Sequence, residues 1–387
     1  MIRITDKKNC CGCSACVQRC PKQSIRLEED TEGFLYPKVN EETCIKCGLC
    51  EKVCPILNQA DKLPVQEVLA VKNPDEEERM NSSSGGVFLP LARKVINKGG
   101  VVFGAVYDES WEVHNVYAEK IEDIYPMMGS KYLQSRIETA YRDAERFLKQ
   151  GREVMFVGSP CQIAGLRTFL RNKEYPNLLA VDFLCHGVPS PGVWRRYLAE
   201  TYGGYDAKKQ SRLQATAGKN SVLSSDIHYD NPFMRGFLSD IYLRPSCYEC
   251  KCKNGVNHSD LTIGDYWAAR VTDQDFDDDK GVGLVLVNTL KGKEYFDWLN
   301  MTVRKSDLDK ANLCNGGFNE HTHAHPKRAL FFALIYQGKT IKDAVDICLK
   351  ISLSSRVKNK TKRLVKGVVK QVLGDKGVKV IKTALGK

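Results

Sequence analysis

Two runs of cysteine near the start of the chain share one spacing. Each reads C-x2-C-x2-C-x3-C-P, and the cysteines are Cys10, Cys13, Cys16 and Cys20 in the first run and Cys44, Cys47, Cys50 and Cys54 in the second. This is the bacterial pattern that holds a pair of [4Fe–4S] clusters, in which the fourth cysteine of each run binds the other cluster. A disulfide framework and zinc sites are the alternatives, but zinc sites usually pair two C-x2-C units or include histidine. The spacing therefore predicts a two-cluster ferredoxin module.

The crossing of the fourth cysteine predicts the ligands of each cluster. The ligands of the cluster that we call cluster one are predicted to be Cys10, Cys13, Cys16 and Cys54. Those of cluster two are predicted to be Cys44, Cys47, Cys50 and Cys20. Cys11 lies outside the pattern, and we interpret it as a small spectator residue.

A further set of cysteines lies later in the chain. Its members are Cys161, Cys185, Cys247 and Cys250. Four thiolates are enough for a third [4Fe–4S] cluster. Two alternatives remain open from the spacing alone: an all-thiolate zinc site, or a ligand set in which Cys252 replaces one of the four.

The elements that position these residues begin near residue 68, where short β-like runs alternate with helical stretches. Such alternation is typical of an α/β domain with a largely parallel or mixed sheet. Strands are predicted at 68–71, 100–106, 154–157, 178–184, 261–263 and 282–287, and helices at about 85–97, 138–149, 161–172 and 191–201. The polar segment 203–235 is expected to be an irregular inserted loop.

Three of the predicted strands lead directly into chemically suggestive loops. They are followed by Gly158-Ser159-Pro160-Cys161-Gln162, by Cys185-His186-Gly187 and by Gly264-Asp265-Tyr266-Trp267. Ligands of open α/β sheets bind outside the carboxyl ends of the strands, so these loops are expected to build one site. Ordinary turn chemistry of Gly and Pro is the alternative for any single loop.

Two other segments have the residue types of a phosphate or flavin contact. Ser83-Ser84-Gly85-Gly86 precedes an apolar helical run, and such a helix start offers free backbone N–H groups to a phosphate, although a plain N-cap uses the same residues. Residues 127–135 combine small, cationic and aromatic side chains. Neither a GxGxxG nor a GxxxxGK[ST] motif occurs, so the sequence supports neither a Rossmann fingerprint nor a P-loop.

Length and composition bound the class of protein. A chain of 387 residues suggests about two to three domains, and 42% hydrophobic and 27% charged residues are ordinary for a soluble globular protein. Clusters and free thiolates need a reducing compartment, so we expect the cytoplasm and no disulfides. The first residues resemble no secretory signal, and no run approaches the roughly 20 apolar residues that cross a bilayer.

The net charge of +11 is concentrated at the C-terminal end. Residues 351–387 hold eleven Lys or Arg and one acidic residue, Asp375, which makes +10 of the +11. Nucleic-acid binding by the whole protein is therefore not indicated. Residues 356–387 read as basic amphipathic helix, which suits an anionic membrane at the inner face or an acidic partner. A terminal helix docked by its apolar face is the alternative.

Several motifs together resemble the coenzyme F420 hydrogenase/dehydrogenase beta-subunit family from about residue 68 to 290. They are the serine–glycine motif at 83–88, the stretches 99–105 and 130–135, the loops at 158–162 and 185–191, Cys247-x2-Cys250 and the motif at 263–267. The ferredoxin-like extension of the family also resembles residues 1–59. The resemblance implies an iron–sulfur flavoprotein that binds FAD beside a cluster of the α/β domain.

Carried over by motif, the resemblance implies two sets of residues. The flavin contacts would be Ser83, Ser84, Gly85, Gly86, Lys131, Tyr132, Gln134 and Ser135. The cluster of the α/β domain would be held by Cys161, Cys185, Cys247 and Cys250, and Cys252 stands where the family pattern has another residue. No catalytic residue is implied. F420 is one substrate of the family, which also includes members that reduce other substrates, and members with the ferredoxin extension look like ones associated with bacterial polysaccharide gene sets.

These observations combine into one expectation. The ferredoxin module spans 1–59, a linker 60–67, the FAD and iron–sulfur domain 68–350 and the basic helical tail 351–387. The expected function is a cytoplasmic oxidoreductase that passes electrons between [4Fe–4S] clusters and FAD and on to F420 or another small molecule. An electron-transfer subunit that serves a partner enzyme, with no substrate site of its own, is the alternative. A redox partner protein or a small-molecule electron acceptor is expected in either case.

Overall fold

The N-terminal module is built around a hairpin and two short helices. The computed structural model describes residues 1–203, 231–314 and 316–350 of the chain. Strands β1 (Ile25–Glu29) and β2 (Leu35–Val39) pair antiparallel, and helices α1 (Ala15–Arg19) and α2 (Leu49–Lys52) each begin inside a cysteine run. Both helices follow a residue in the left-handed region, which bends each cysteine run into a tight loop.

The α/β domain is organised on one eight-stranded sheet in the order β10-β3-β9-β8-β7-β6-β4-β5. Its strands are β3 (Glu67–Lys72), β4 (Val101–Tyr107), β5 (Val113–Ala118), β6 (Val154–Gly158), β7 (Leu178–Phe183), β8 (Leu261–Asp265), β9 (Gly283–Val287) and β10 (Thr302–Ser306). The pairs β4–β6, β6–β7 and β7–β8 are parallel and all others antiparallel. The sheet is therefore mixed, and the six predicted strands are confirmed.

Two strands were not predicted, and both lie at the edges of the sheet. Among the strands of the described residues, β5 has β4 and β10 has β3 as its one neighbour, and β5 also makes an isolated bridge to Arg136. β10 contains Arg304 and Lys305, and charged side chains are common on edge strands because they discourage pairing with other chains. The same side chains weaken the hydrophobic pattern by which a strand is recognised.

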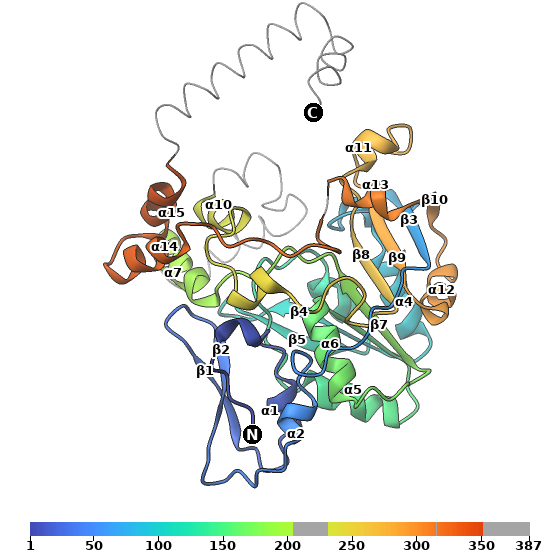
Figure 1. Cartoon of the computed structure of the whole chain (residues 1–387). Helices are drawn as coiled ribbons and strands as arrows, with labels where there is room; N and C mark the ends of the chain where they lie inside the picture. The colour runs from blue at the N-terminus through green and yellow to red at the C-terminus, as the bar shows by residue number, and fades with distance from the viewer. Residues whose placement is uncertain (204–230, 315, 351–387) are drawn as a thin grey trace, which may run out of the picture.

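Helices cover both faces of the sheet (Figure 1). Helices α4 (Phe88–Asn97) and α12 (Leu290–Asp297) pack on one face, and α5 (Ala140–Lys149) and α6 (Pro160–Phe169) on the other. Successive residues of β6 divide between the two cores, because side chains alternate along a strand. Val154 and Phe156 join the core under α5 and α6, and Met155 joins the core under α4.

A separate helical cluster lies beside the sheet. It consists of α7 (Pro191–Tyr202), α10 (Pro232–Leu238), α14 (Arg328–Tyr336) and α15 (Ile341–Leu349) around aromatic side chains such as Trp194, Phe233 and Phe331. Helix α10 corrects the expectation that 203–235 is irregular to its end, because Pro232 and the side-chain cap of Asn231 start a helix there. The predicted tail helices at 356–387 lie outside the described residues.

Short helices complete the described chain. They are η1 (Lys7–Asn9), α3 (Glu76–Met80), η2 (Glu122–Met127), η3 (Pro245–Glu249), α11 (Ala269–Thr272) and α13 (Leu308–Asn312). Among the described residues, no helix has the length and apolar character needed to cross a membrane.

The ferredoxin module packs against α5 and α6, as Figure 1 shows for the blue segment. Residues of the module share one apolar core with these helices. The Thr168 hydroxyl of α6 donates to the Val53 carbonyl at 2.8 Å, and a Cβ on Gly165 would lie 2.8 Å from the Cys13 Cβ. Glycine at 165 thus lets α6 approach a cysteine run closely.

Candidate functional site

The four cysteines predicted for cluster two surround one cavity. Cys44, Cys47 and Cys50 of the second run line it together with Cys20 of the first run. Backbone N–H groups of Ile2 and Ser24 donate to the sulfurs of Cys50 and Cys20, each at 3.3 Å. Cys47 is exposed, so this cavity lies at the surface of the module. The fold therefore places Cys20, the fourth cysteine of the first run, beside the cysteines of the second run, as the spacing predicted.

The cysteines predicted for cluster one lie deeper. Cys10, Cys13 and Cys16 are buried, and Cys54 is half-buried. Burial raises the pKa of the Cys16 thiol far above its usual range and that of Cys54 to about 11. Such thiols ionise readily only beside a strong positive charge, and coordinated iron supplies one. A metal cluster bound by this set would therefore have to supply the positive charge that keeps these thiols ionised.

The third set of cysteines also gathers around one cavity. Cys161, Cys185, Cys247 and Cys250 all line it. Burial raises the pKa of Cys185 to about 12 and that of Cys250 to about 11, so these thiols too need a cation to ionise. Of the three loops predicted to build one site, those after β6 and β7 line this cavity and the loop at 264–267 does not. Two further thiols come from η3 and its C-terminal end.

Local structure explains how these thiols converge. Parallel strands β6 and β7 are neighbours, and the loops that carry Cys161 and Cys185 follow their carboxyl ends. Cys161 is the second residue of α6, whose first turn is held by a capping box between Ser159 and Gln162. The Val188 N–H donates to the Cys247 sulfur at 3.4 Å, which ties η3 to the loop after β7.

Cys11 and Cys252 line the same cavity, and Cys11 is the residue whose place sequence reasoning missed. Both are buried, and hydrogen bonds connect the Cys11 thiol with Cys161 and with Cys252. Cys11 thus stands between the ferredoxin module and the third set of cysteines. The only signal in the sequence was that Cys11 stands next to Cys10. The contact between Cys11 and Cys161 joins residues about 150 positions apart, so no local pattern predicts it.

The cysteines surround spaces instead of converging on single points. Among the described residues, no three His, Cys, Asp or Glu side chains are arranged as ligands of one metal ion. Zinc needs its four ligand atoms within about 2.3 Å of one centre. That the third set of cysteines holds a [4Fe–4S] cluster instead of zinc stays a prediction.

The residues predicted as flavin contacts divide into two groups. Ser83 and Ser84 meet the loop at 130–132 near the carboxyl end of β8, where Ser130 donates to Ser83 at 3.4 Å and Ser84 hydrogen bonds with Asp265. Gly85 lies against the backbone of β3 and β9, since a Cβ there would be 2.3 Å from the Val71 carbonyl.

Gln134 and Ser135 face the ferredoxin module and α6 instead. Gln134 donates to the Cys11 carbonyl at 3.2 Å, and Ser135 accepts from Gln162 at 2.8 Å. Gln134 therefore has a partner in the ferredoxin module, whereas the Ser135 hydroxyl, which also donates to Asn115 Oδ1 at 2.9 Å, has its partners within the α/β domain. That all eight residues contact one flavin stays a prediction.

The positive charge of Lys131, near Ser83 and Ser84 in the first group of predicted flavin contacts, fits an anionic ligand. Burial lowers the pKa of Lys131 to about 7, and its ammonium donates to the Met128 carbonyl at 2.7 Å. The described residues place no carboxylate within ion-pair distance of it. Tyr132, which hydrogen bonds with Ser130, packs against Phe237. A half-buried lysine beside two serine-bearing loops suits the phosphates of FAD, and the residues present fit that group.

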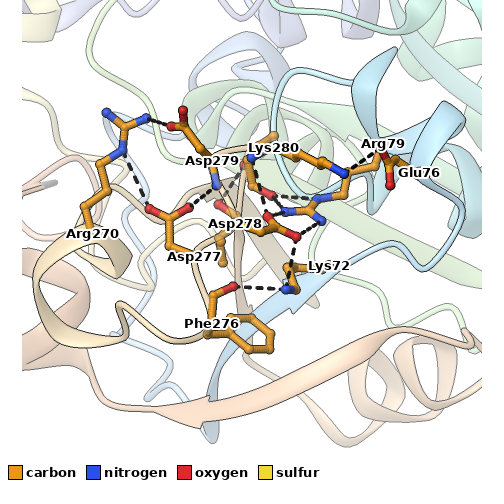
Figure 2. Close-up of polar contacts among 12 residues, drawn as sticks. Lys72, Glu76, Arg79, Arg270, Phe276, Asp277, Asp278, Asp279 and Lys280 are labelled. Atoms are coloured by element: carbon orange, nitrogen blue, oxygen red, sulfur yellow. Dashed lines mark hydrogen bonds and ion pairs between the residues drawn. The ribbon is translucent and has the colours of Figure 1, made fainter.

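An ion-pair cluster holds the serine loop in place (Figure 2). Asp278 lies between Lys72 and Arg79, accepting from Arg79 Nη1 at 2.8 Å and from Lys72 at 3.3 Å. Arg79 Nε also donates to the Gly281 carbonyl at 2.8 Å. Because Arg79 lies in the last turn of α3, just before the serine loop, this cluster fixes the loop against residues 276–281. Sequence reasoning missed it, since its partners are about 200 residues apart.

Comparison with known proteins identifies two regions. Residues 151–307 match the family model for the C terminus of the beta subunit of coenzyme F420 hydrogenase/dehydrogenase, and residues 9–57 match a 4Fe-4S dicluster domain. The first region contains all four cysteines of the third set. The predicted flavin contacts at 83–135 lie before it.

Two curated relatives are similar to the chain. The F subunit of the F420H2 dehydrogenase of Methanosarcina mazei is 24% identical over 316 residues, which cover 79% of this chain and 86% of that protein. The coenzyme F420-dependent sulfite reductase of Methanocaldococcus jannaschii is 28% identical over 169 residues, 42% of this chain and 26% of that protein. Both names describe oxidoreductases.

A solved structure from the F420-reducing [NiFe] hydrogenase complex of Methanosarcina barkeri aligns with a TM-score of 0.42 and 15% identity, over 73% of this chain and 90% of that one. The dicluster match and the beta-subunit match occupy separate regions of this chain. The chain thus joins a 4Fe-4S dicluster domain to a region that matches the C terminus of the coenzyme F420 hydrogenase/dehydrogenase beta subunit, and it is an iron–sulfur oxidoreductase.

Proposed function

We propose that the protein passes electrons between three [4Fe–4S] clusters and one FAD, and exchanges electron pairs with F420 or another small molecule. The single observation that carries this proposal is the cavity lined by Cys161, Cys185, Cys247 and Cys250, which Cys11 of the ferredoxin module also lines. The buried cysteine run of cluster one and the third set of cysteines are therefore neighbours. When bound, FAD would take or give two electrons at once, and clusters would carry them singly.

The chain's own residues have distinct roles in this proposal. Ser83, Ser84, Gly85 and Gly86 offer hydroxyl and backbone groups to the flavin phosphates, and Lys131 neutralises their charge. Tyr132 shields the same site from water. Gln134 holds the module against the domain, so we assign it to that interface, and Ser135 is held by Asn115 and Gln162 within the α/β domain. Asp265, whose carboxyl pKa is raised by burial, stands at the carboxyl end of β8 beside Ser84.

A subunit that only transfers electrons for a partner enzyme is the second candidate, because the relative from Methanosarcina mazei is named as a subunit. In that case the protein would hold flavin but turn over no small molecule by itself. Anaerobic assay of the isolated protein with reduced F420 as the electron donor and an artificial one-electron acceptor separates the two. Turnover of F420 supports the enzyme, and electron transfer to the acceptor only from another reduced protein supports the subunit.

The first experiment is anaerobic purification, followed by measurement of iron, sulfide and flavin per chain. We expect about twelve irons and one FAD, since three [4Fe–4S] clusters hold four irons each. About eight irons with FAD would remove the third cluster from the proposal. About eight irons without flavin would overturn the oxidoreductase mechanism and leave a ferredoxin joined to an α/β binding domain.

A further inference from the structure

Arg244 is a fully buried cation at the junction between the two parts of the protein. It comes from the α/β domain, and its exposed fraction is 0%. Its Nε donates to the Cys10 carbonyl at 2.8 Å, Nη2 to the Leu35 carbonyl at 3.0 Å and Nη1 to Gln134 Oε1 at 3.0 Å. The guanidinium also lies 4.3 Å from the centre of the Tyr36 ring. The side chain thus reaches across the interface into the ferredoxin module.

The charge of Arg244 has no carboxylate partner among the described residues. The other buried arginines there, Arg79 and Arg167, each form an ion pair with an aspartate. A buried charge without a counter-charge is costly, so an anion is expected beside it. The candidate is the Cys10 sulfur, which accepts from Nη2 at 3.5 Å. Carbonyls and a ring face supply only dipoles.

We propose that Arg244 is the counter-charge of cluster one and raises the reduction potential of that cluster. The proposal rests on the assignment of Cys10 as a ligand in the proposed function. A thiolate-bound cluster is anionic and gains a further negative charge on reduction, so a desolvated cation beside one ligand favours the reduced form. Hydrogen bonds to ligand sulfurs act in the same direction.

The position of Arg244 in the chain extends this role. It directly precedes η3, which contains Cys247 of the third set. One cation therefore stands between a ligand of cluster one and a ligand of the third site. Arginine suits this place better than lysine, because its planar fork satisfies several acceptors at once while keeping its charge. Replacing Arg244 should therefore change how electrons are distributed between cluster one and the third site, where the two parts of the protein meet.

The test is a potentiometric titration followed by EPR, on whole protein prepared anaerobically. In R244Q we expect the midpoint potential of one ferredoxin cluster to fall by at least a tenfold change in its one-electron equilibrium, about 59 mV. The potential of the other, more exposed cluster should stay unchanged in the same sample. R244K keeps the charge and should shift the potential less than R244Q does.

Two further variants separate charge from docking. R195M removes another arginine of the same interface, which pairs with Glu29 and Glu112 and contacts no cysteine, and should leave every midpoint unchanged. Q134E gives Arg244 a carboxylate partner at constant volume, and should lower the same midpoint as R244Q. If R195M shifts that midpoint as far as R244Q, docking is the cause and the proposal is overturned.

Iron content keeps the outcomes distinct. R244Q with full iron and unchanged midpoints overturns the role of Arg244. If R244Q loses about four irons, the midpoint of the lost cluster cannot be compared, and Q134E becomes the deciding variant. An unchanged midpoint in Q134E then overturns the role of Arg244. Wild-type protein that is folded but lacks the ferredoxin clusters would overturn the proposed function instead.

Discussion

Gln18 of the ferredoxin module caps a helix of the α/β domain by accepting from the Tyr141 N–H. The distance from Gln18 Oε1 to Tyr141 N is 3.1 Å, and the same oxygen accepts from Arg142 N at 3.3 Å. These are N–H groups of the first turn of α5, which have no partner within a helix. Thr139, which precedes the helix, makes no side-chain cap. The module therefore completes a helix that covers the sheet.

Removing this cap should weaken the whole protein. Because a lost N-cap costs about 1 kcal/mol, we expect Gln18→Ala to lower the free energy of unfolding by about 1–2 kcal/mol, including the packing of a buried side chain. Anaerobic urea unfolding measures the change. The matched control is Gln66→Ala, an exposed glutamine, which should stay within about 0.5 kcal/mol. Equal stability of the two variants would argue that module and domain are not coupled through α5.

The ion-pair cluster around Asp278 (Figure 2) contains two neighbouring aspartates that serve as a matched pair for mutation. Asp278 pairs with buried Arg79, whereas Asp279 pairs with exposed Arg270. We expect Asp278→Asn to cost about 2 kcal/mol, because hydrogen bonds between charged groups are lost and Arg79 stays buried. Asp279→Asn should cost less than about 0.5 kcal/mol. Thermal unfolding compares the two, and bound FAD after desalting shows whether the serine loop has loosened.

The same pair predicts a pH effect with a definite sign. Hydrogen bonding to Arg79 holds the pKa of Asp278 well below its usual range. A carboxylate with a depressed folded-state pKa stabilises the protein above its unfolded pKa of about 4 and loses that contribution as the pH falls. The free energies of unfolding at pH 7 and at about pH 3 should therefore differ less in Asp278→Asn than in wild type. An equal difference in both proteins would contradict this assignment.

Lys131 predicts how flavin binding depends on pH. Burial lowers the pKa of its ammonium to about 7, so the free protein loses this positive charge as the pH rises through 7. Because a charged lysine attracts phosphate, the affinity of flavin-free protein for FAD should fall between pH 6 and pH 9. Lys131→Met should bind FAD at least about tenfold more weakly at pH 6, about 1.4 kcal/mol, and lose this pH dependence.

Exposed Lys120 provides the control for that measurement. Lys120→Met should bind FAD as wild type does at every pH. Fluorescence quenching of FAD on titration with protein gives the dissociation constants. A Lys131→Met variant that keeps the wild-type pH profile would show that the flavin phosphates lie elsewhere.

Iron content can decide between Cys250 and Cys252 as the ligand of the third cluster. Cys250 belongs to the predicted set, and Cys252 lines the same cavity with an exposed fraction of 1%. We expect Cys250→Ser to lose about four irons per chain and Cys252→Ser to keep all of them. Cys348→Ser, at a buried cysteine of the helical cluster, controls for general destabilisation. The reverse result would assign Cys252 as the ligand.

Much of the fold was predictable because it depends on neighbours in sequence. Alternating short apolar runs predicted the six inner strands, and the two cysteine runs predicted both the dicluster domain and the crossing of Cys20 toward Cys44, Cys47 and Cys50. The edge strands β5 and β10 were missed, since an edge strand needs no continuous apolar pattern. The helix at 232–238 was missed as well, because a polar segment precedes it.

The sequence by itself determined which residues could bind iron, because cluster ligands follow a short and specific spacing. Only the tertiary structure decided what stands beside them. Arg244 meets Cys10, and Cys11 meets Cys252, across more than 230 residues of chain. No local pattern encodes such contacts, since they depend on how α6 and η3 pack against the module. The electrostatic surroundings of a cluster are therefore a property of the folded chain.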